Sequence, residues 1–132
     1  MSISEETKLW IASAERDRDT VEILQASNRP PYEIIAYHCQ QCAEKYLKAI
    51  FIERGRKPPY VHDLLKLNRD CAEFCHELES VESDCERLTP FGTITRYPGS
   101  IMEPSAAHMP WVTGWMENIR NAVQSCLSKP NV

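Results

Sequence analysis

The sequence predicts an all-α domain built as an antiparallel up-and-down bundle of four to five helices. Along most of the chain, apolar residues recur at the three- and four-residue spacing of a buried helix face. No segment alternates with the two-residue period of a strand. The 132 residues are enough for one domain, so we predict a single unit over residues 1–132.

Two long helices are expected in the first half of the chain, over about residues 5–26 and 32–54. Ser4 is placed to cap the first helix, because a serine side chain accepts hydrogen bonds from the free N–H groups there. Asp17 interrupts the apolar stripe of this helix. The second helix has the broadest apolar face and should be the most buried element, and Gly55 ends it as a C-cap glycine would. That face includes Ile35, Cys39, Cys42, Tyr46 and Ala49.

A third helix should begin after Asp63, which suits the N-cap position. Its apolar residues are expected to face one way without a break through Leu64, Leu67, Cys71, Phe74 and Leu78. Residues 88–109 are expected to form mainly ordered loop. The final helix should begin near Pro110, since proline is well suited to the first helical position, and should end at Lys129.

Charge and composition exclude several classes of protein. The formal net charge of -4 argues against a protein that coats nucleic acid by bulk charge. Residues 70–86 contain seven acidic residues and no lysine or arginine, typical of a solvated helix face and loop, although this stretch could also meet a basic partner. The sequence contains no stretch of about 18 apolar residues, so it predicts no membrane span. The N-terminus has no apolar leader core, so we expect a cytoplasmic protein.

The six cysteines allow a disulfide framework, a metal site, exposed redox-sensitive thiols or buried thiols. A chain without a leader should remain in a reducing compartment, where disulfides are rare. Cys39 and Cys42 lie within a helical pattern, whereas structural zinc takes such pairs from turns. We therefore expect six reduced thiols that act as small buried hydrophobes, and no metal or cofactor. The alternative metal site would use Cys39, Cys42, Cys71, Cys75 and His76.

A polar stripe on the second helix predicts a phosphate-binding site. Its three- and four-residue spacing places on one face His38, Gln41, Lys45 and Lys48. A turn at the paired prolines 58 and 59 would bring His62 and Asp63 back near the C-terminal end of that helix. Arg96 would then add a third permanent cation able to hold a phosphate bidentately. Tyr97 would add an aromatic ring that could stack on a base.

The same residues also have a structural interpretation. Lys45 could be an ordinary solvated charge, and Lys48 could pair with Glu44 one helical turn before it. His62 and Asp63 could merely start a helix. The segment 96–98 could be a clasp in which the arginine holds helix carbonyls or a carboxylate.

These residues occur in a combination that is typical of one family. The combination consists of His38–Ala49 (HCQQCAEKYLKA), Gly55, Pro58–Pro59, His62–Leu64 and Thr95–Pro98. It resembles the HEPN family (higher eukaryotes and prokaryotes nucleotide-binding domain) from about Trp10 to the final helix. The resemblance implies an all-helical bundle, often paired as a dimer, that commonly accompanies a minimal nucleotidyltransferase. Many such domains are thought to be toxins or partners in two-component systems.

One branch of that family implies an alternative, a metal-independent ribonuclease. Its members use an arginine and a histidine a few residues apart near the start of a late helix, with the site completed across a dimer. Arg96 stands at the expected place, but eleven residues separate it from His108. Arg69 and His76 meet the spacing and would share one face of the third helix. They would be the catalytic residues of a ribonuclease.

Another alternative is a pure helical dimerisation or interaction module. Trp111 and Trp115 lie four residues apart on the final helix and could form a dimer seam, since aromatic residues are enriched in interfaces. Trp115 also lies on the inner stripe, where core packing would explain it. Among these alternatives, we expect a homodimer that acts as partner of a nucleotidyltransferase-type protein in a toxin–antitoxin-like system. Nucleotide or RNA phosphate is the candidate ligand.

Overall fold

The computed structural model describes residues 3–92 and 104–129. In this part of the chain all regular secondary structure is helical, which confirms the predicted helical bundle. The five α-helices are α1 (Glu5–Gln25), α2 (Tyr32–Glu53), α3 (Leu64–Ala72), α4 (Glu82–Leu88) and α5 (Met109–Leu127). Three 3₁₀ helices accompany them: η1 (His76–Val81), η2 (Thr89–Gly92) and η4 (Ala106–His108).

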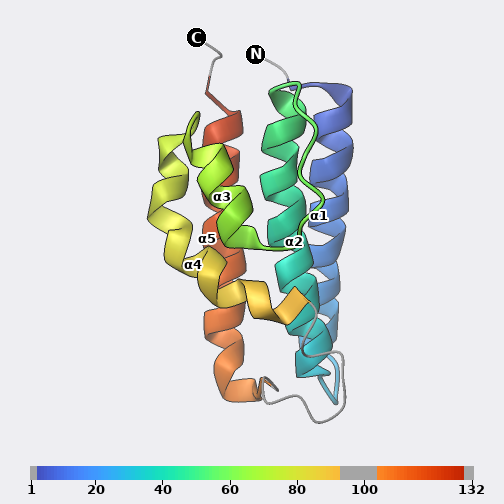
Figure 1. Cartoon of the computed structure of the whole chain (residues 1–132). Coiled ribbons are helices and arrows are strands. Elements are labelled where there is room, and N and C mark those ends of the chain that lie inside the picture. The colour runs from blue at the N-terminus through green and yellow to red at the C-terminus, as the bar shows by residue number, and fades with distance from the viewer. Residues whose placement is uncertain (1–2, 93–103, 130–132) are drawn as a thin grey trace.

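The three long helices form the frame of the bundle (Figure 1). The central helix α2 contacts α1, α5 and α3. The start of α1 and the end of α5 lie at the same end of the molecule, and α2 runs antiparallel to α1 (Figure 1). The shorter helices α3 and α4 pack beside α5 and α2, and the connector of residues 54–63 runs back across α2 (Figure 1). The largest fully buried apolar side chains include Tyr46, Ile35, Leu47, Leu64 and Leu67.

Local sequence signals set most of the helix ends as predicted. The hydroxyl of Ser4 accepts from the backbone N–H of Thr7 at 3.1 Å and caps α1. Gly55 follows the end of α2 with φ +73°, a left-handed conformation that glycine adopts without strain. The Asp63 carboxylate accepts from two backbone N–H groups of the first turn of α3. Pro110 stands in the first turn of α5.

The third helix is shorter than its apolar pattern predicts. It ends at Ala72, and Cys75 has an extended backbone with φ -153° before η1 begins. Leu78 is still fully buried, but it reaches the core from η1 instead of from a continuing α-helix. The side-chain amide of Asn68 donates to the Leu78 carbonyl at 2.9 Å. This bond satisfies a backbone acceptor beyond the break and fixes η1 against α3.

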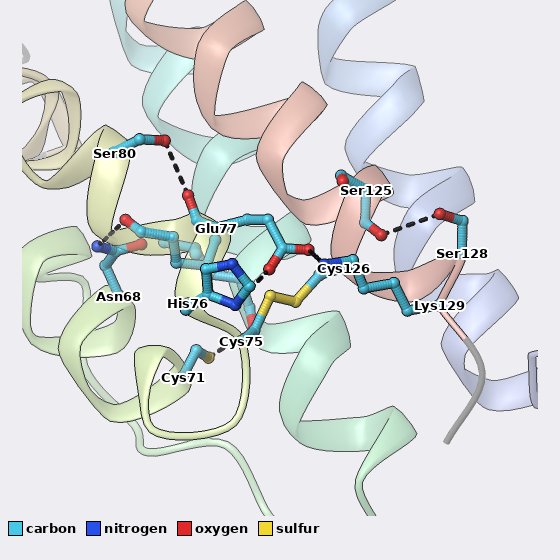
Figure 2. Close-up of a disulfide and its surroundings, with 12 residues drawn as sticks. Asn68, Cys71, Cys75, His76, Glu77, Ser80, Ser125, Cys126, Ser128 and Lys129 are labelled. Carbon is cyan, nitrogen blue, oxygen red and sulfur yellow. Dashed lines mark hydrogen bonds and ion pairs between the residues drawn. A yellow bond between two sulfur atoms is a disulfide. The ribbon is translucent and has the colours of Figure 1, made fainter. Parts of the chain in front are cut away.

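A disulfide joins Cys75 to Cys126, which lies in the last turn of α5 (Figure 2). The two Cα atoms are 6.0 Å apart, within the usual range for a disulfide. The prediction that all six thiols stay reduced is therefore wrong for this pair. That prediction assumed a reducing compartment and a third helix that continues past Cys75. The chain instead turns after α3 ends at Ala72, and the turn brings Cys75 against α5. Figure 2 also shows the ion pair of Lys129 with Glu77 beside the bond.

The other four cysteines are free and buried, as predicted: Cys39, Cys42, Cys71 and Cys85. Burial raises the pKa of the Cys39 thiol to about 12, mainly because the thiolate would lose its hydration. Burial likewise raises the pKa of the Cys71 thiol to about 12. Within residues 3–92 and 104–129, no group of three or more His, Cys, Asp or Glu side chains is arranged to hold a metal ion. None of the helices described is both long and apolar enough to cross a membrane.

Candidate functional site

The predicted polar stripe divides between two sides of α2. On the side facing α1, the Asp17 carboxylate is 8% exposed and holds two residues of the stripe. Nδ1 of His38 lies 2.8 Å from one carboxylate oxygen, and Nζ of Lys45 lies 2.7 Å from the other. A carboxylate only accepts hydrogen bonds, so His38 donates through Nδ1. His38 and Lys45 are thus committed to holding α1 against α2.

On the other side of α2, four residues form what we call the Glu44 cluster: Gln40, Glu44, Lys48 and His62. One Glu44 oxygen accepts from Gln40 Nε2 at 3.2 Å and lies 2.9 Å from His62 Nδ1. The other oxygen pairs with Lys48 Nζ at 3.2 Å, which is the pairing that the structural interpretation expected. Gln40 also donates to the backbone carbonyl of His62 at 3.0 Å and accepts from Gln41 at 2.8 Å.

Within the cluster, only His62 is substantially exposed to solvent. The side chains of Glu44 and Lys48 are 7% and 9% exposed, whereas that of His62 is 54% exposed. A buried carboxylate that accepts from one ring nitrogen fixes the tautomer and orientation of an imidazole. Nε2 of His62 has no hydrogen-bond partner among the described residues. The cluster therefore presents an oriented imidazole to solvent.

The charges of the cluster also single out His62. Glu44 and Lys48 form an ion pair and cancel one another, so the net charge of the cluster is set by the His62 ring. Gly92 closes one side of the cluster, because a Cβ built on it would lie 2.8 Å from Gln40 Cδ. Arg96 and Tyr97, two further predicted ligand residues, lie outside the described residues.

The connector before His62 carries the positive charge that the polar stripe does not supply. Residues 54–63 contain three lysines and arginines, Arg54, Arg56 and Lys57, and one acidic residue, Asp63, which caps α3. The guanidinium groups of Arg54 and Arg56 lie 4.7 and 5.3 Å from the ring centroid of Phe74. Arg56 and Lys57 are exposed. The prediction missed these residues, although their contrast with the acidic stretch 70–86 is visible in the sequence.

The predicted ribonuclease pair does not share a helix face. Arg69 lies on α3, and its guanidinium binds the Glu82 carboxylate at 2.7 Å. His76 lies in η1 beyond the end of α3, with its Nδ1 3.1 Å from Glu77. The expectation of one common face is wrong because it required α3 to continue past Ala72.

A second polar network, which the sequence prediction missed, ties together the three long helices. Both nitrogens of the Arg120 fork donate to Glu15 at 2.9 Å, and the Tyr46 hydroxyl donates to the same carboxylate at 2.6 Å. The hydrogen bond from Arg120 is the largest influence on Glu15 and lowers the pKa of that carboxyl. Burial is the main cause that raises the pKa of Tyr46. These groups are paired with one another and serve to join α1, α2 and α5.

The remaining surface features do not suit a phosphate. A shallow groove of about 400 Å³ lies between α5 and the η1–α4 segment, but its lining includes Glu77 and Asp84. Trp115 is partly buried and packs against the core, while Trp111 is 64% exposed. The dimer seam proposed for these two tryptophans stays a prediction.

The family model that describes the HEPN domain matches residues 7–126. The match extends from the first turn of α1 to the last turn of α5 and so includes every residue of the Glu44 cluster. Comparison of the chain with curated proteins and with solved structures finds no match.

Proposed function

Because the chain belongs to the HEPN domain family, we propose that it binds a nucleotide or RNA phosphate at His62 and the adjoining basic connector. The observation that carries this proposal is an exposed imidazole held by the buried carboxylate of Glu44, at the end of a connector with three permanent cations. We further propose that the chain acts as a homodimer and as partner of a minimal nucleotidyltransferase in a toxin–antitoxin-like system, as the family membership suggests.

The geometry of the cluster explains why His62, and not Lys45 or Lys48, is the residue to contact phosphate. Lys45 is neutralised by Asp17, and Lys48 is both buried and neutralised by Glu44. His62 donates to Glu44 through Nδ1, which leaves Nε2 for a ligand. In the imidazolium form, Nε2–H donates a charge-assisted hydrogen bond to a phosphate oxygen. Arg56 and Lys57 supply additional charge in the same connector.

The pairing of His62 with Glu44 also makes His62 a candidate catalytic residue for the alternative function, a ribonuclease. The sequence prediction did not assign His62 to that function. When its ring is neutral, an imidazole that donates through Nδ1 has a basic nitrogen at Nε2. Such a nitrogen can remove a proton from a ribose hydroxyl that comes within hydrogen-bond distance. The same set of variants can therefore distinguish RNA binding at His62 from RNA cleavage by His62.

The test is a titration of a short, labelled single-stranded RNA with wild type, His62→Gln and His76→Gln. His76 is the matched control, because it is also an exposed histidine beside a glutamate but lies in the acidic part of the surface. We expect His62→Gln to weaken binding and His76→Gln to leave it unchanged. Added salt should weaken the binding of wild type, since phosphate contacts release counterions.

Equal affinities of the two variants would contradict the proposed site. If wild type cleaves the RNA and His62→Gln does not, the chain is a ribonuclease that uses His62. The partner proposal is tested separately, by co-expression of the chain with a minimal nucleotidyltransferase from the same genome. A stable complex on size exclusion supports the proposal, and separate elution of the two proteins contradicts it.

A further inference from the structure

Tyr60 is an aromatic side chain that the fold leaves in solvent. It is 94% exposed, more than any other large apolar side chain that the structure describes. Its ring centroid lies 6.1 Å from that of His62, with the two planes inclined at 59°. Nζ of Lys48 lies 6.0 Å from the Tyr60 centroid. The exposed ring is therefore next to the Glu44 cluster.

The backbone holds Tyr60 in this exposed position. The N–H of Val61 donates to the carbonyl of Pro59 at 2.9 Å, which makes Tyr60 the central residue of a three-residue turn. Pro58 and Pro59 restrict the chain immediately before it, because each proline ring fixes φ. The backbone that carries the ring therefore loses little conformational freedom when a ligand binds.

We propose that Tyr60 is the platform on which a base of the bound nucleotide or single-stranded RNA stacks. This inference rests on the proposed function: His62 and the basic connector bind the phosphate, and Tyr60 binds the base. The spacing of the two rings lies within the span of one nucleotide. Stacking on an aromatic side chain is tolerant of sequence, since every base has a π face. The ligand class is thus a nucleotide or single-stranded RNA with accessible bases, without sequence preference at this position.

The experiment compares two probes with the same number of phosphates: a short oligoadenylate RNA and an abasic oligomer of equal length. Affinities are measured for wild type, Tyr60→Ala, Tyr60→Phe and His62→Gln. We expect wild type to bind the oligoadenylate about 5- to 150-fold more tightly than the abasic oligomer, the range that one stacked base supplies. Tyr60→Ala should remove this difference without weakening the abasic complex, and Tyr60→Phe should retain it because it keeps the ring.

The outcomes separate this inference from the proposed function. If wild type binds both probes equally, or if Tyr60→Ala keeps the preference for oligoadenylate, the stacking role is refuted and phosphate binding at His62 stands. If His62→Gln weakens the binding of both probes, the phosphate site is supported. The preference for oligoadenylate over the abasic oligomer then measures stacking alone. If wild type binds neither probe, both proposals fail. Because Tyr60 is 94% exposed, its replacement should leave the helical circular dichroism spectrum unchanged.

Discussion

Reduction of the Cys75–Cys126 disulfide should lower the free energy of unfolding by up to about 4 kcal/mol. The two cysteines are 51 positions apart in the sequence, so the bond closes a long loop in the unfolded chain. For a loop of this length, the chain-entropy model gives a loss of about 14 cal/mol/K, equivalent to about 4 kcal/mol at room temperature. The bond also joins the start of η1 to the last turn of α5, two segments that are far apart in sequence.

The measurement is urea unfolding, followed by circular dichroism, with and without a reductant. At a typical urea dependence for a small domain, the expected loss shifts the midpoint by about 1 to 4 M. The double variant Cys75→Ser/Cys126→Ser is the control, and its midpoint should not respond to reductant. In the native protein, alkylation should modify no thiol before reduction and only Cys126, which is partly buried, after it. Cys75 is buried, and so are Cys39 and Cys71, whose raised pKa disfavours the reactive thiolate.

Coincident midpoints with and without reductant would refute the reasoning, as would alkylation of Cys126 in the unreduced native protein. The compartment then determines when the bond is present. In an oxidising compartment the pair persists, whereas glutathione in a cytoplasm keeps most thiols reduced.

Two further predictions concern the packing of the cluster and the polar network. In the same urea assay, Gly92→Ala should destabilise the protein by about 1 to 3 kcal/mol, because the new Cβ would lie 2.8 Å from the buried Gln40 side chain. Gly114→Ala on α5 should instead stabilise the protein by about 0.5 to 1 kcal/mol, because a Cβ at this position would have no atom within 4 Å. The pKa of Glu15 is lowered from 4.5 by Arg120, so its contribution to stability should be complete above pH 4.5 and be lost as pH falls through the lower folded value. Glu15→Gln should therefore reduce the slope of stability against pH below about pH 4.5, and an unchanged slope would contradict this assignment.

The fold could be predicted from the sequence because the signals that set it are local. Ser4, Gly55 and Asp63 each act on backbone groups within a few residues, and the apolar spacing of α2 identifies its buried face without knowledge of its neighbours. The end of α3 is different. Residues 73–78 retain a helical apolar spacing, but the chain breaks there and is held by the contact of Asn68 with Leu78. That contact depends on tertiary packing, so periodicity alone could not locate the break.

The sequence indicates the arrangement of the candidate site only in part, for a related reason. The three- and four-residue spacing correctly placed polar residues along α2, but it could not show that this helix is buried on several sides. Lys45 and Lys48 consequently face different partners, one on α1 and one within α2. The position of Asp17 within an apolar stripe was a usable signal, since a charge in that place needs a buried counterion.

The charge distribution explains how a protein of net charge -4 could bind phosphate. Ion pairs neutralise the two lysines of the polar stripe, and seven of the acidic residues lie within the stretch 70–86. The exposed positive charge that precedes the cluster in the chain is that of residues 54–63, in which Arg56 and Lys57 come before His62. So short a segment can contact only a few phosphates, and the salt dependence of binding scales with that number. We therefore expect the phosphate contacts alone to give weak binding with a shallow salt dependence. A base stacked on Tyr60 would add affinity that does not depend on salt.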